Sequence, residues 1–299
     1  MHDIVIVGAG TAGLSAAIYA QRAGKNVLLL EQLSYGGQII NTPEVENYPG
    51  IKSISGFDFA TGLYEQAMAL GAKMESAQVT GIVDGSEKKV LTKNGEYPCK
   101  AVILATGAKN RPLGLARESE LIGNGVSYCA TCDGAFFRKR PVAVNGGGNT
   151  ALEDALFLSN YCSKVYLVHR RDAFRGEAKQ VEQLRAKENV EFVLNATISR
   201  LIGDDGLSAI EVTDKLSGEK REIEVDGLFI AIGQMPENQA FAPLIRLDAS
   251  GYIEAGEDCK TNIEGIYAAG DCRTKTVRQL TTAAADGAVA ALAACSYIG

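Results

Sequence analysis

The chain has 299 residues, of which 46% are hydrophobic and 22% charged, and its formal net charge is -6. This length predicts about two globular domains, and the negative charge argues against nucleic acid as the main partner. No run of about 18 apolar residues occurs, and the start lacks the basic region of a signal peptide, so neither a membrane span nor a leader is expected.

The first predicted element is a buried parallel strand at residues 3–7, a short β-branched run. A GxGxxG pattern follows at residues 8–13, then a predicted helix over 14–23 and a second strand at 27–30. In this context the glycines allow a tight turn and let the backbone approach a pyrophosphate, whose charge the helix N-terminus favours. Glu31 ends the second strand, where a carboxylate accepts ribose hydrogen bonds and repels a 2′-phosphate. We therefore expect FAD or NAD, not NADP, at this site.

The middle of the chain carries the segment Cys-Ala-Thr-Cys-Asp-Gly at residues 129–134. Two thiols at this spacing can close a small redox-active disulfide, and the acid beside the second thiol is close enough to exchange a proton with it. The pair lies between two dinucleotide-binding patterns. That position would let electrons from a bound dinucleotide reach the thiols.

The second dinucleotide pattern begins with a predicted strand at 141–144 and a Gly-Gly-Gly-Asn-Thr-Ala segment at 146–151. A helix over 151–161 and a strand at 164–168 follow, and the strand ends in a run at 169–175 with one histidine and three arginines. Guanidinium groups bind phosphate bidentately, and charged hydrogen bonds of about 1.5–3 kcal/mol each would favour NADPH over NADH by about one to two decades per contact. The alternative interpretation is a solvated basic run. We expect NADPH here.

Two apolar strands, predicted at 101–107 and 227–233, each end in glycine and precede a proline, which is a linker signal. We therefore predict an α/β protein with two Rossmann-like dinucleotide-binding domains, the NADPH domain at 113–240 being inserted into an FAD domain at 1–112 and 241–299. The other predicted elements are β-hairpins within 201–225, a strand at 266–271 and an alanine-rich closing helix at 280–297.

Cysteine usage fits a reducing cytosol, because seven scattered cysteines do not form the disulfide framework of a secreted protein. A structural zinc site would need four ligands, and the chain has no second CxxC and only two histidines, so no metal is expected. A structural disulfide is the other alternative to a redox role. Asp133 could also be only a turn-forming residue before glycine. We predict that Cys99, Cys162, Cys259, Cys272 and Cys295 are small buried hydrophobes.

Taken together, these motifs resemble the low-molecular-weight, bacterial-type, NADPH-dependent thioredoxin reductases over nearly the whole chain. Further segments that carry the resemblance are Gly-Gly-Gln at 36–38, Glu-Asn-Tyr-Pro-Gly at 46–50, Ala-Thr-Gly at 105–107, Gly-Asp at 270–271 and Arg-Gln at 278–279. The resemblance implies a cytoplasmic homodimer with one FAD per subunit, and thioredoxin as the protein substrate. It also implies a rotation of the NADPH domain between two states.

The resemblance and the motifs together give a set of expected site residues. The expected catalytic residues are Cys129, Cys132 and Asp133, with Cys132 nearer the flavin. The residues expected to bind FAD are Gly8, Gly10, Gly13, Glu31, Gly36, Gly37, Gln38, Asn47, Val79, Thr106, Gly107, Asp271, Arg278, Gln279 and Leu280. The residues expected to bind NADPH are Gly146, Gly148, Asn149, Thr150, His169, Arg170, Arg171 and Arg175.

Several related activities are weighed against this one. The glutathione-reductase class carries a CxxxxC pair in its N-terminal flavin domain, whereas no cysteine precedes Cys99 here. A flavoprotein subunit that serves a peroxiredoxin usually has an extra N-terminal module and prefers NADH. A disulfide reductase for another thioredoxin-like protein stays open, and a redox-insensitive nucleotide-binding regulator would be colourless. Relatives that take electrons from ferredoxin have lost the arginine run, which this chain keeps.

Overall fold

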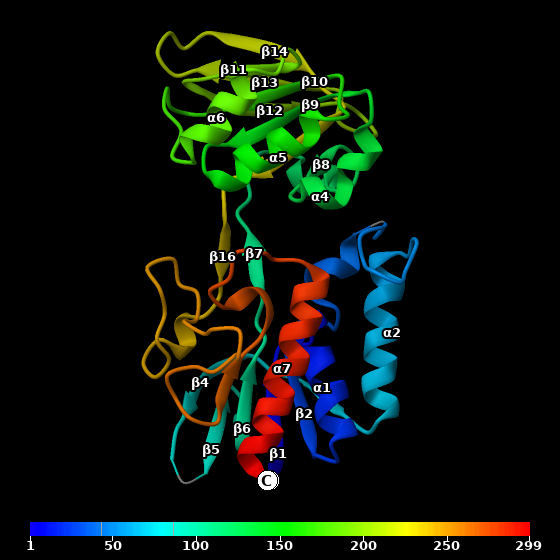
Figure 1. Ribbon diagram of the computed structural model, residues 1–299, viewed down its shortest axis with the longest axis vertical. Helices are drawn as coiled ribbons and strands as arrows, with labels where there is room; N and C mark the ends of the chain where they lie inside the picture. The colour runs from blue at the N-terminus through cyan, green and yellow to red at the C-terminus, as the bar shows by residue number, and fades with distance from the viewer. Residues whose placement is uncertain (43, 86) are drawn as a thin grey trace. The chain divides into compact units, whose positions relative to one another are not determined.

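The structure is a computed structural model that describes residues 1–42, 44–85 and 87–299 (Figure 1). The chain divides into two compact units, and the second unit is inserted into the first. The first unit comprises Met1–Lys109 and Met235–Gly299, and the second comprises Asn110–Gln234.

The chain passes between the units at two places. The predicted domain boundaries, after residues 112 and 240, lie three and six residues beyond the observed ones. Two short strands contain these crossings, β7 (Ala108–Asn110) and β16 (Gln234–Pro236), and they pair with each other in a two-stranded sheet.

The first unit is built on one mixed sheet of seven strands. Its main path, in spatial order, runs through β3 (Lys73–Ser76), β2 (Val27–Glu31), β1 (His2–Val7), β6 (Gly95–Leu104), β5 (Lys88–Thr92) and β4 (Val79–Val83), and β17 (Ile266–Ala268) also pairs with β6. Strands β1, β2 and β3 run parallel, as does β17 beside β6, whereas β4, β5 and β6 form an antiparallel meander. The predicted strands at 3–7 and 27–30 thus lie side by side at the centre of the sheet.

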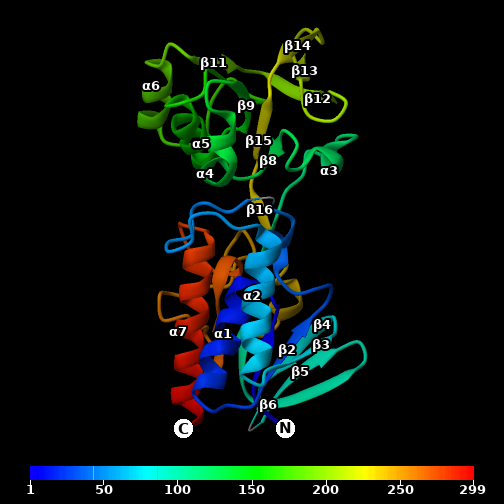
Figure 2. The ribbon, with the colours of Figure 1, turned by 90° about the vertical axis from the view of Figure 1, so that its right-hand side faces the viewer.

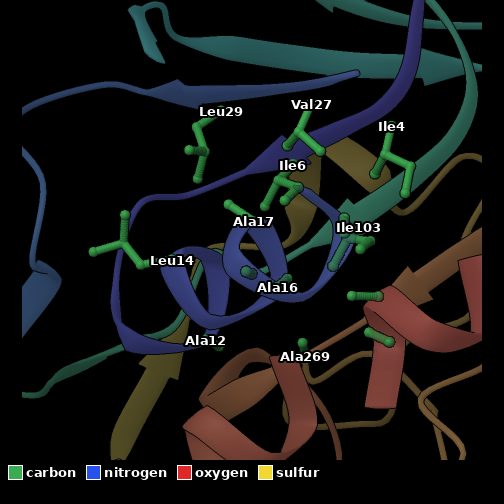
Figure 3. Close-up of a cluster of buried hydrophobic side chains, with 14 of the residues drawn as sticks. Ile4, Ile6, Ala12, Leu14, Ala16, Ala17, Val27, Leu29, Ile103 and Ala269 are labelled. Carbon is green, nitrogen blue, oxygen red and sulfur yellow. The ribbon is translucent and has the colours of Figure 1, made fainter. Parts of the chain in front are cut away.

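Alternating side chains of β1 feed two separate cores, as the period of two along a strand requires. Ile4 and Ile6 belong to a buried cluster beneath the helices (Figure 3), whereas Val5 and Val7 belong to a second cluster on the opposite face. Each of these four side chains is no more than 5% exposed. The central strand is therefore buried on both faces, which is why its sequence is uniformly apolar.

Three helices lie alongside one another in the first unit (Figure 2). They are α1 (Thr11–Arg22), α2 (Gly56–Ala69) and α7 (Leu280–Ile298), and the short 3-10 helices are η1 (Gly37–Asn41), η3 (Gln239–Phe241) and η4 (Gly270–Cys272). Helices α1 and α7 approach closely, because a Cβ at Gly287 would lie 2.2 Å from the Ala12 carbonyl oxygen. The Ser15 hydroxyl also donates to the Ala284 carbonyl oxygen at 2.7 Å.

Helix α7 is long and apolar enough to cross a membrane by length and composition, which the sequence analysis did not expect. Core helices of soluble proteins have the same properties, so one such helix is weak evidence for a membrane span. The alanine and glycine positions of α7 provide its contact with α1, and Ala290, Ala291 and Ala294 are fully buried.

The second unit has a parallel five-stranded sheet and a separate antiparallel three-stranded sheet. The parallel sheet has the spatial order β11 (Val190–Val193), β10 (Lys164–Val168), β9 (Pro141–Gly146), β15 (Gly227–Ala231) and β8 (Val126–Ser127). The antiparallel sheet consists of β12 (Ala196–Ile202), β13 (Ala209–Asp214) and β14 (Lys220–Glu224), where the sequence predicts hairpins. The helices are α3 (Glu118–Leu121), α4 (Ala130–Asp133), η2 (Gly134–Phe137), α5 (Asn149–Ser159) and α6 (Ala178–Arg185).

Candidate active site

Cys129 and Cys132 form a disulfide at the start of the short helix α4. Cys129 is the extended residue that precedes α4, and Cys132 lies within the helical turn, so their Cα atoms are 5.3 Å apart. Both cysteines are partly exposed, whereas Ala130 between them is buried. The predicted thiol pair is therefore joined and accessible at the surface of the second unit.

Asp133 directly follows Cys132 in the sequence, and its carboxylate accepts a hydrogen bond from a serine hydroxyl. The Ser127 hydroxyl donates to Asp133 Oδ2 at 2.6 Å. Asp133 Oδ1 is buried and has no hydrogen-bond partner among the described residues. Burial raises the pKa of Asp133, and the bond from Ser127 opposes this rise. A buried carboxyl with a raised pKa can hold a proton closer to neutral pH than a free one, as proton exchange with a thiol requires.

Helix α5 packs against the turn that contains the disulfide. A Cβ at Gly134 would lie 2.4 Å from the Tyr161 hydroxyl and 2.9 Å from a methyl group of Leu158, so a larger residue here would require these side chains to move. The Tyr161 ring in turn stacks edge-on against Phe157 with ring centres 5.2 Å apart. The glycine after Asp133 therefore serves the packing of the active-site turn.

The other five cysteines form no disulfide. Cys99, Cys162, Cys259 and Cys272 are buried as predicted, and Cys295 is partly buried. Burial raises the pKa of Cys99 and Cys259 to about 12, and of Cys162 to about 11. A thiol with so high a pKa is a poor nucleophile at neutral pH, because the thiolate is the reactive species. No group of three or more His, Cys, Asp or Glu side chains suited to a metal ion occurs in the described part of the chain.

The first glycine pattern forms a turn between β1 and α1 in which the glycines have two different roles. A Cβ at Gly8, where φ is +105°, would lie 2.3 Å from the Ala105 carbonyl oxygen, and one at Gly13 would lie 1.9 Å from the Gly8 carbonyl oxygen. A Cβ at Gly10 would meet nothing closer than 3.9 Å. Gly8 and Gly13 therefore let the chain pack on itself, whereas Gly10 leaves an open approach to the backbone at the N-terminus of α1.

Glu31 lies at the end of β2, where two backbone amides hold its carboxylate. Ala9 N–H donates to Oε2 at 2.9 Å and Leu33 N–H donates to Oε1 at 3.0 Å. These bonds fix the carboxylate beside the glycine turn. Gly36 and Gly37, both with positive φ, complete this edge, because Gly36 N–H donates to the Ala9 carbonyl oxygen at 2.8 Å.

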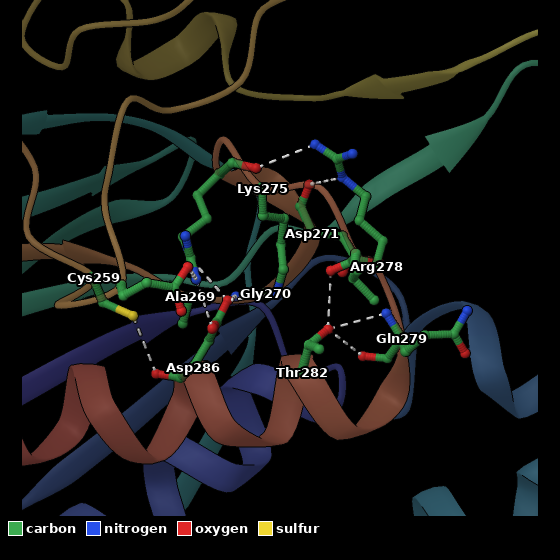
Figure 4. Close-up of polar contacts among 12 residues, drawn as sticks. Cys259, Ala269, Gly270, Asp271, Lys275, Arg278, Gln279, Thr282 and Asp286 are labelled. Atoms are coloured by element: carbon green, nitrogen blue, oxygen red, sulfur yellow. Dashed lines mark hydrogen bonds and ion pairs between the residues drawn. The ribbon is translucent and has the colours of Figure 1, made fainter. Parts of the chain in front are cut away.

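Asp271 and Arg278 form a second part of the first-unit site, next to the N-terminus of α7 (Figure 4). Asp271 Oδ1 is buried with no hydrogen-bond partner among the described residues. Burial raises the pKa of Asp271, and the charges of Lys275 and Arg278 partly offset it. The Arg278 guanidinium lies 4.1 Å from the centre of the Tyr252 ring and donates to the Asp271 carbonyl oxygen at 3.4 Å.

Other residues predicted for this site form hydrogen bonds between segments that lie far apart in the sequence. Asn47 Nδ2 donates to Gln279 Oε1 at 3.3 Å, and Gln279 also forms a capping box with Thr282 at the start of α7, one residue before Leu280. Gln38 Nε2 donates to the Ala108 carbonyl oxygen. Val79 is a half-buried residue of β4 in the cluster with Val7, and Gly107 has a positive φ of 68° just after β6.

Two buried polar residues that sequence reasoning missed, Asp286 and Asn238, stabilise this region through hydrogen bonds. The buried Asp286 carboxylate accepts both Nε and Nη2 of Arg273 at 2.8 Å, Lys275 Nζ at 2.9 Å and the Gly270 N–H at 2.9 Å. Burial alone would raise the pKa of Asp286, but Arg273 and Lys275 outweigh it and hold the pKa low. The fully buried Asn238 accepts from Thr106 Oγ1 at 2.9 Å and donates to the Cys272 carbonyl oxygen at 2.8 Å.

The second glycine pattern repeats this construction between β9 and α5. A Cβ at Gly146 would lie 2.4 Å from the Ala231 carbonyl oxygen, and one at Gly147 would lie 2.1 Å from the His169 ring, whereas one at Gly148 would meet nothing within 4 Å. Asn149 and Thr150 begin α5 and are exposed, and Asn149 Oδ1 accepts from the Glu177 N–H at 2.9 Å. The open glycine again stands next to a helix N-terminus.

His169, which the sequence predicts to bind NADPH together with the arginines after it, is buried, whereas those arginines are exposed. It is 5% exposed, contacts the Ala173 carbonyl oxygen through Nε2 at 3.2 Å and stacks on Phe174 with ring centres 5.1 Å apart. Burial and, to a smaller extent, the neighbouring arginines lower its pKa. A neutral imidazole packed under Gly147 supports the loop and adds no positive charge to it.

Arg170, Arg171 and Arg175 are exposed at the end of β10. The Arg175 N–H donates to the Gly147 carbonyl oxygen at 2.8 Å, which places this basic loop beside the glycine turn. No ion pair to any of these three guanidinium groups occurs among the residues that the structure describes. Three uncompensated cations next to an open helix N-terminus make a site for an anionic group.

Comparisons with known proteins agree with this geometry. The sequence profile of the pyridine nucleotide-disulphide oxidoreductase family matches residues 2–287. Thioredoxin reductase from Listeria innocua is 43% identical over 100% of this chain and 94% of its own length, and that from Bacillus subtilis is 41% identical over 100% and 95%. The crystal structure of thioredoxin reductase from Streptococcus pyogenes has a TM-score of 0.95 and 38% identity, covering 99% of this chain and 98% of that one.

Proposed function

The chain belongs to the pyridine nucleotide-disulphide oxidoreductase family and within it to the bacterial-type thioredoxin reductases, and from this premise we propose how its residues divide the reaction. With FAD held by the first unit and NADPH by the second, the Cys129–Cys132 disulfide would receive two electrons, and the resulting dithiol would pass them to oxidised thioredoxin. The observation that carries the proposal is the disulfide itself, which is partly exposed, with the half-buried acid Asp133 beside it.

The first unit suits FAD. Gly10 leaves room for a pyrophosphate at the N-terminus of α1, and the fixed Glu31 carboxylate accepts hydrogen bonds from a ribose. The unpartnered Oδ1 of Asp271 is buried and would accept a hydrogen bond from a ribityl hydroxyl. Asn47, Gln279 and Arg278 would line the isoalloxazine. When bound, FAD supplies a carrier that takes a hydride from a nicotinamide and gives two electrons to a disulfide.

The second unit suits NADPH more than NADH. Both cofactors have a pyrophosphate that the Gly148 turn and the N-terminus of α5 can bind. Only NADPH has a 2′-phosphate, and the unpaired guanidinium groups of Arg170, Arg171 and Arg175 would bind it. A carboxylate at the corresponding place, as in Glu31, would repel that phosphate. The preference for NADPH therefore rests on charge at the end of β10.

The disulfide exchange conserves electrons and protons. Two electrons and two protons convert Cys129–Cys132 into two thiols. One of these, as a thiolate, attacks the disulfide of thioredoxin and forms a mixed disulfide, and the other thiolate then breaks that bond. The products are the restored Cys129–Cys132 disulfide and reduced thioredoxin. Asp133 would accept a proton from a thiol and return it to a departing thiolate.

The setting of the enzyme is also part of the proposal. We infer a cytoplasmic homodimer with no membrane or nucleic-acid partner. The homodimer is what the family resemblance implies, the acidic net charge of -6 argues against nucleic acid, and the partly exposed redox cysteines fit a reducing cytosol. For contact with thioredoxin, Phe136 is 44% exposed after the active-site turn, whereas Phe137 packs edge-on against Phe229. Of these two aromatic side chains, Phe136 is therefore the one available to a protein partner.

The proposal is tested by anaerobic titration of the purified flavoprotein with NADPH and then with NADH, followed by addition of oxidised bacterial thioredoxin. We expect NADPH to bleach the flavin absorbance at far lower concentration than NADH, and thioredoxin to restore it. Cys129→Ser and Cys132→Ser should lose thioredoxin reduction and keep flavin reduction, because they break the relay after the flavin. The matched control Cys162→Ala removes a buried thiol of the same unit and should keep both steps.

Four outcomes would contradict the proposal. Thioredoxin reduction that survives in either serine variant would remove the disulfide from the electron path. Equal use of NADH and NADPH would overturn the preference assigned to the arginines. A colourless protein that binds no FAD, or a flavin that only reduced ferredoxin can bleach, would point to a different electron donor or a different role.

A further inference from the structure

Ser127 connects the two chemical groups of the redox turn although it belongs to neither. It is the last residue of β8, an edge strand of the parallel sheet, and its side chain is buried. Its hydroxyl accepts a hydrogen bond from the Cys129 N–H at 3.0 Å and donates one to Asp133 Oδ2 at 2.6 Å. The Cys129 carbonyl oxygen lies farther from the hydroxyl, at 3.4 Å, so the single hydroxyl proton is directed to the carboxylate.

The surroundings of Asp133 leave Ser127 as the group that stabilises its charge. Helix α4 packs against η2, which has no titratable side chain, and against α5, which carries Glu153 and Asp154. Tyr161 follows α5, and Arg138 lies 5.9 Å from the centre of its ring. None of these groups shifts the pKa of Asp133, whereas burial raises it and the Ser127 bond lowers it.

We propose that Ser127 is a positioning residue for disulfide exchange, which holds the acid Asp133 and the backbone of Cys129 in a fixed relation and sets the pH range of the reaction. The inference rests on the proposed function of the turn. Its physical basis is that a hydrogen bond to a carboxylate is stronger than one to a neutral acid. The hydroxyl therefore favours the form of Asp133 that can accept a proton from a thiol, while burial favours the form that can donate it.

The proton path in this proposal is closed. The ionised Asp133 takes a proton from the thiol that becomes the attacking thiolate, and the resulting acid gives it to the thiolate that leaves the thioredoxin disulfide. The same exchange is repeated when the mixed disulfide breaks: Asp133 takes the proton of the second thiol and gives it to the second thioredoxin sulfur, so two protons pass from the dithiol to thioredoxin. The Ser127 hydroxyl gives up no proton in either step. It keeps Oδ2 occupied, so Oδ1, which is buried and lacks a partner among the described residues, is the oxygen available for the transfer.

The test is the pH dependence of thioredoxin reduction by holoenzyme that has first been reduced anaerobically with NADPH. In Ser127→Ala, the limb of the profile that Asp133 governs should move to higher pH by about one pH unit, because one charged hydrogen bond is lost. Ser127→Thr keeps the hydroxyl and should restore the wild-type profile. Ser199→Ala removes a serine hydroxyl in the antiparallel sheet, where it donates to Glu211, and should leave the profile unchanged.

The possible results separate this inference from the proposed function. Asp133→Asn should abolish the limb; if the limb persists, it does not belong to Asp133 and the inference is wrong. A uniform loss of rate in Ser127→Ala, with the limb in place, would mean that Ser127 only supports the fold and would also overturn it. If Ser127→Ala fails to fold, Ser127→Val replaces the hydroxyl of the Ser127→Thr variant by a methyl group in a side chain of nearly the same shape, and the comparison of these two profiles decides. Failure of the wild-type enzyme to reduce thioredoxin would instead refute the proposed function.

Discussion

The two dinucleotide turns of this protein share one backbone construction and differ in charge. In both, a parallel strand runs through glycines whose Cβ would collide with the chain, and an open glycine follows at the start of a helix. The next strand then ends in the amide-bound carboxylate of Glu31 in the first unit and in the free guanidinium groups of Arg170 and Arg171 in the second. The shared part suits a pyrophosphate, and the part that differs selects the nucleotide.

The third small residue of each turn shows how closely the backbone construction is matched. In the first unit a Cβ at Gly13 would lie 1.9 Å from the Gly8 carbonyl oxygen, so glycine is required. In the second unit the corresponding residue is Ala151, and its methyl group fits because Gly146 opposite it has no side chain; a Cβ there would lie 2.6 Å from that methyl. In the second turn, the missing side chain of Gly146 therefore provides the space that the Ala151 methyl group occupies.

The largest expected effect comes from breaking the shared backbone. Gly13→Ala places a methyl group against the Gly8 carbonyl oxygen, so we expect the free energy of unfolding to fall by about 3 kcal/mol and FAD to be lost. Gly10→Ala is the matched control, because its methyl group meets no protein atom closer than 3.9 Å. It should fold as the wild type but bind FAD less tightly. Chemical denaturation and the flavin absorbance per protein measure the two effects, and a stable, yellow Gly13→Ala protein would refute this account.

An intermediate effect is expected from changing the charge that distinguishes the turns. Replacing Arg170, Arg171 or Arg175 by alanine should lower kcat/KM for NADPH about tenfold to a hundredfold per lost phosphate contact and leave the value for NADH nearly unchanged. The exposed Arg185 of α6 is the control, since its replacement removes the same charge outside the turn. Steady-state kinetics with both nucleotides measure the ratio. A ratio that stays constant in all three variants would mean that the charge difference between the turns does not select the nucleotide.

The smallest effect should come from His169, the residue that supports the second turn from below. Its pKa is lowered in the folded protein, so the unfolded chain binds the proton more tightly and stability must fall as the pH drops below the free-imidazole value of 6.5. We expect this loss in the free energy of unfolding to be less than about 1 kcal/mol, and we expect His169→Phe to abolish it. Denaturation curves of both proteins at pH 7.5 and at about pH 5 measure the difference. If the wild-type protein instead gained stability relative to the variant when the pH is lowered, the effect would have the opposite sign and His169 would not be buried in its neutral form.

Local patterns predicted most of the elements that form these turns. The strands at 3–7, 27–30, 141–144 and 164–168 all occur, since short β-branched runs next to glycine need only their nearest neighbours to be recognised. Helix α2 and strands β4 and β5 were not predicted, and only the second half of β6 was, as part of the strand at 101–107. They combine half-buried and exposed residues without a strong period, and they depend on the sheet that they complete.

The candidate site likewise contains residues that local patterns predict and residues that they do not. The cysteine pair, Asp133 and the glycines are adjacent in sequence, so their spacing alone carries the chemistry. Asp286 and Asn238 could not be found from spacing, because Asp286 meets Arg273 thirteen residues away and Asn238 meets Thr106 from 132 residues away. An isolated Asp or Asn in a sequence has no distinguishing pattern until its partner is known.

By itself, the sequence determined the fold class, the two nucleotide-binding turns, their opposite charges and the redox pair, because each is encoded in a few consecutive residues that act through backbone geometry and local charge. Only the tertiary structure decided that His169 is buried beneath its turn, that Asp271 lacks a partner for one buried oxygen among the described residues, and that Ser127 connects Cys129 to Asp133. These properties depend on burial and on contacts between separate segments. They arise when folding brings those segments together and removes water from between them.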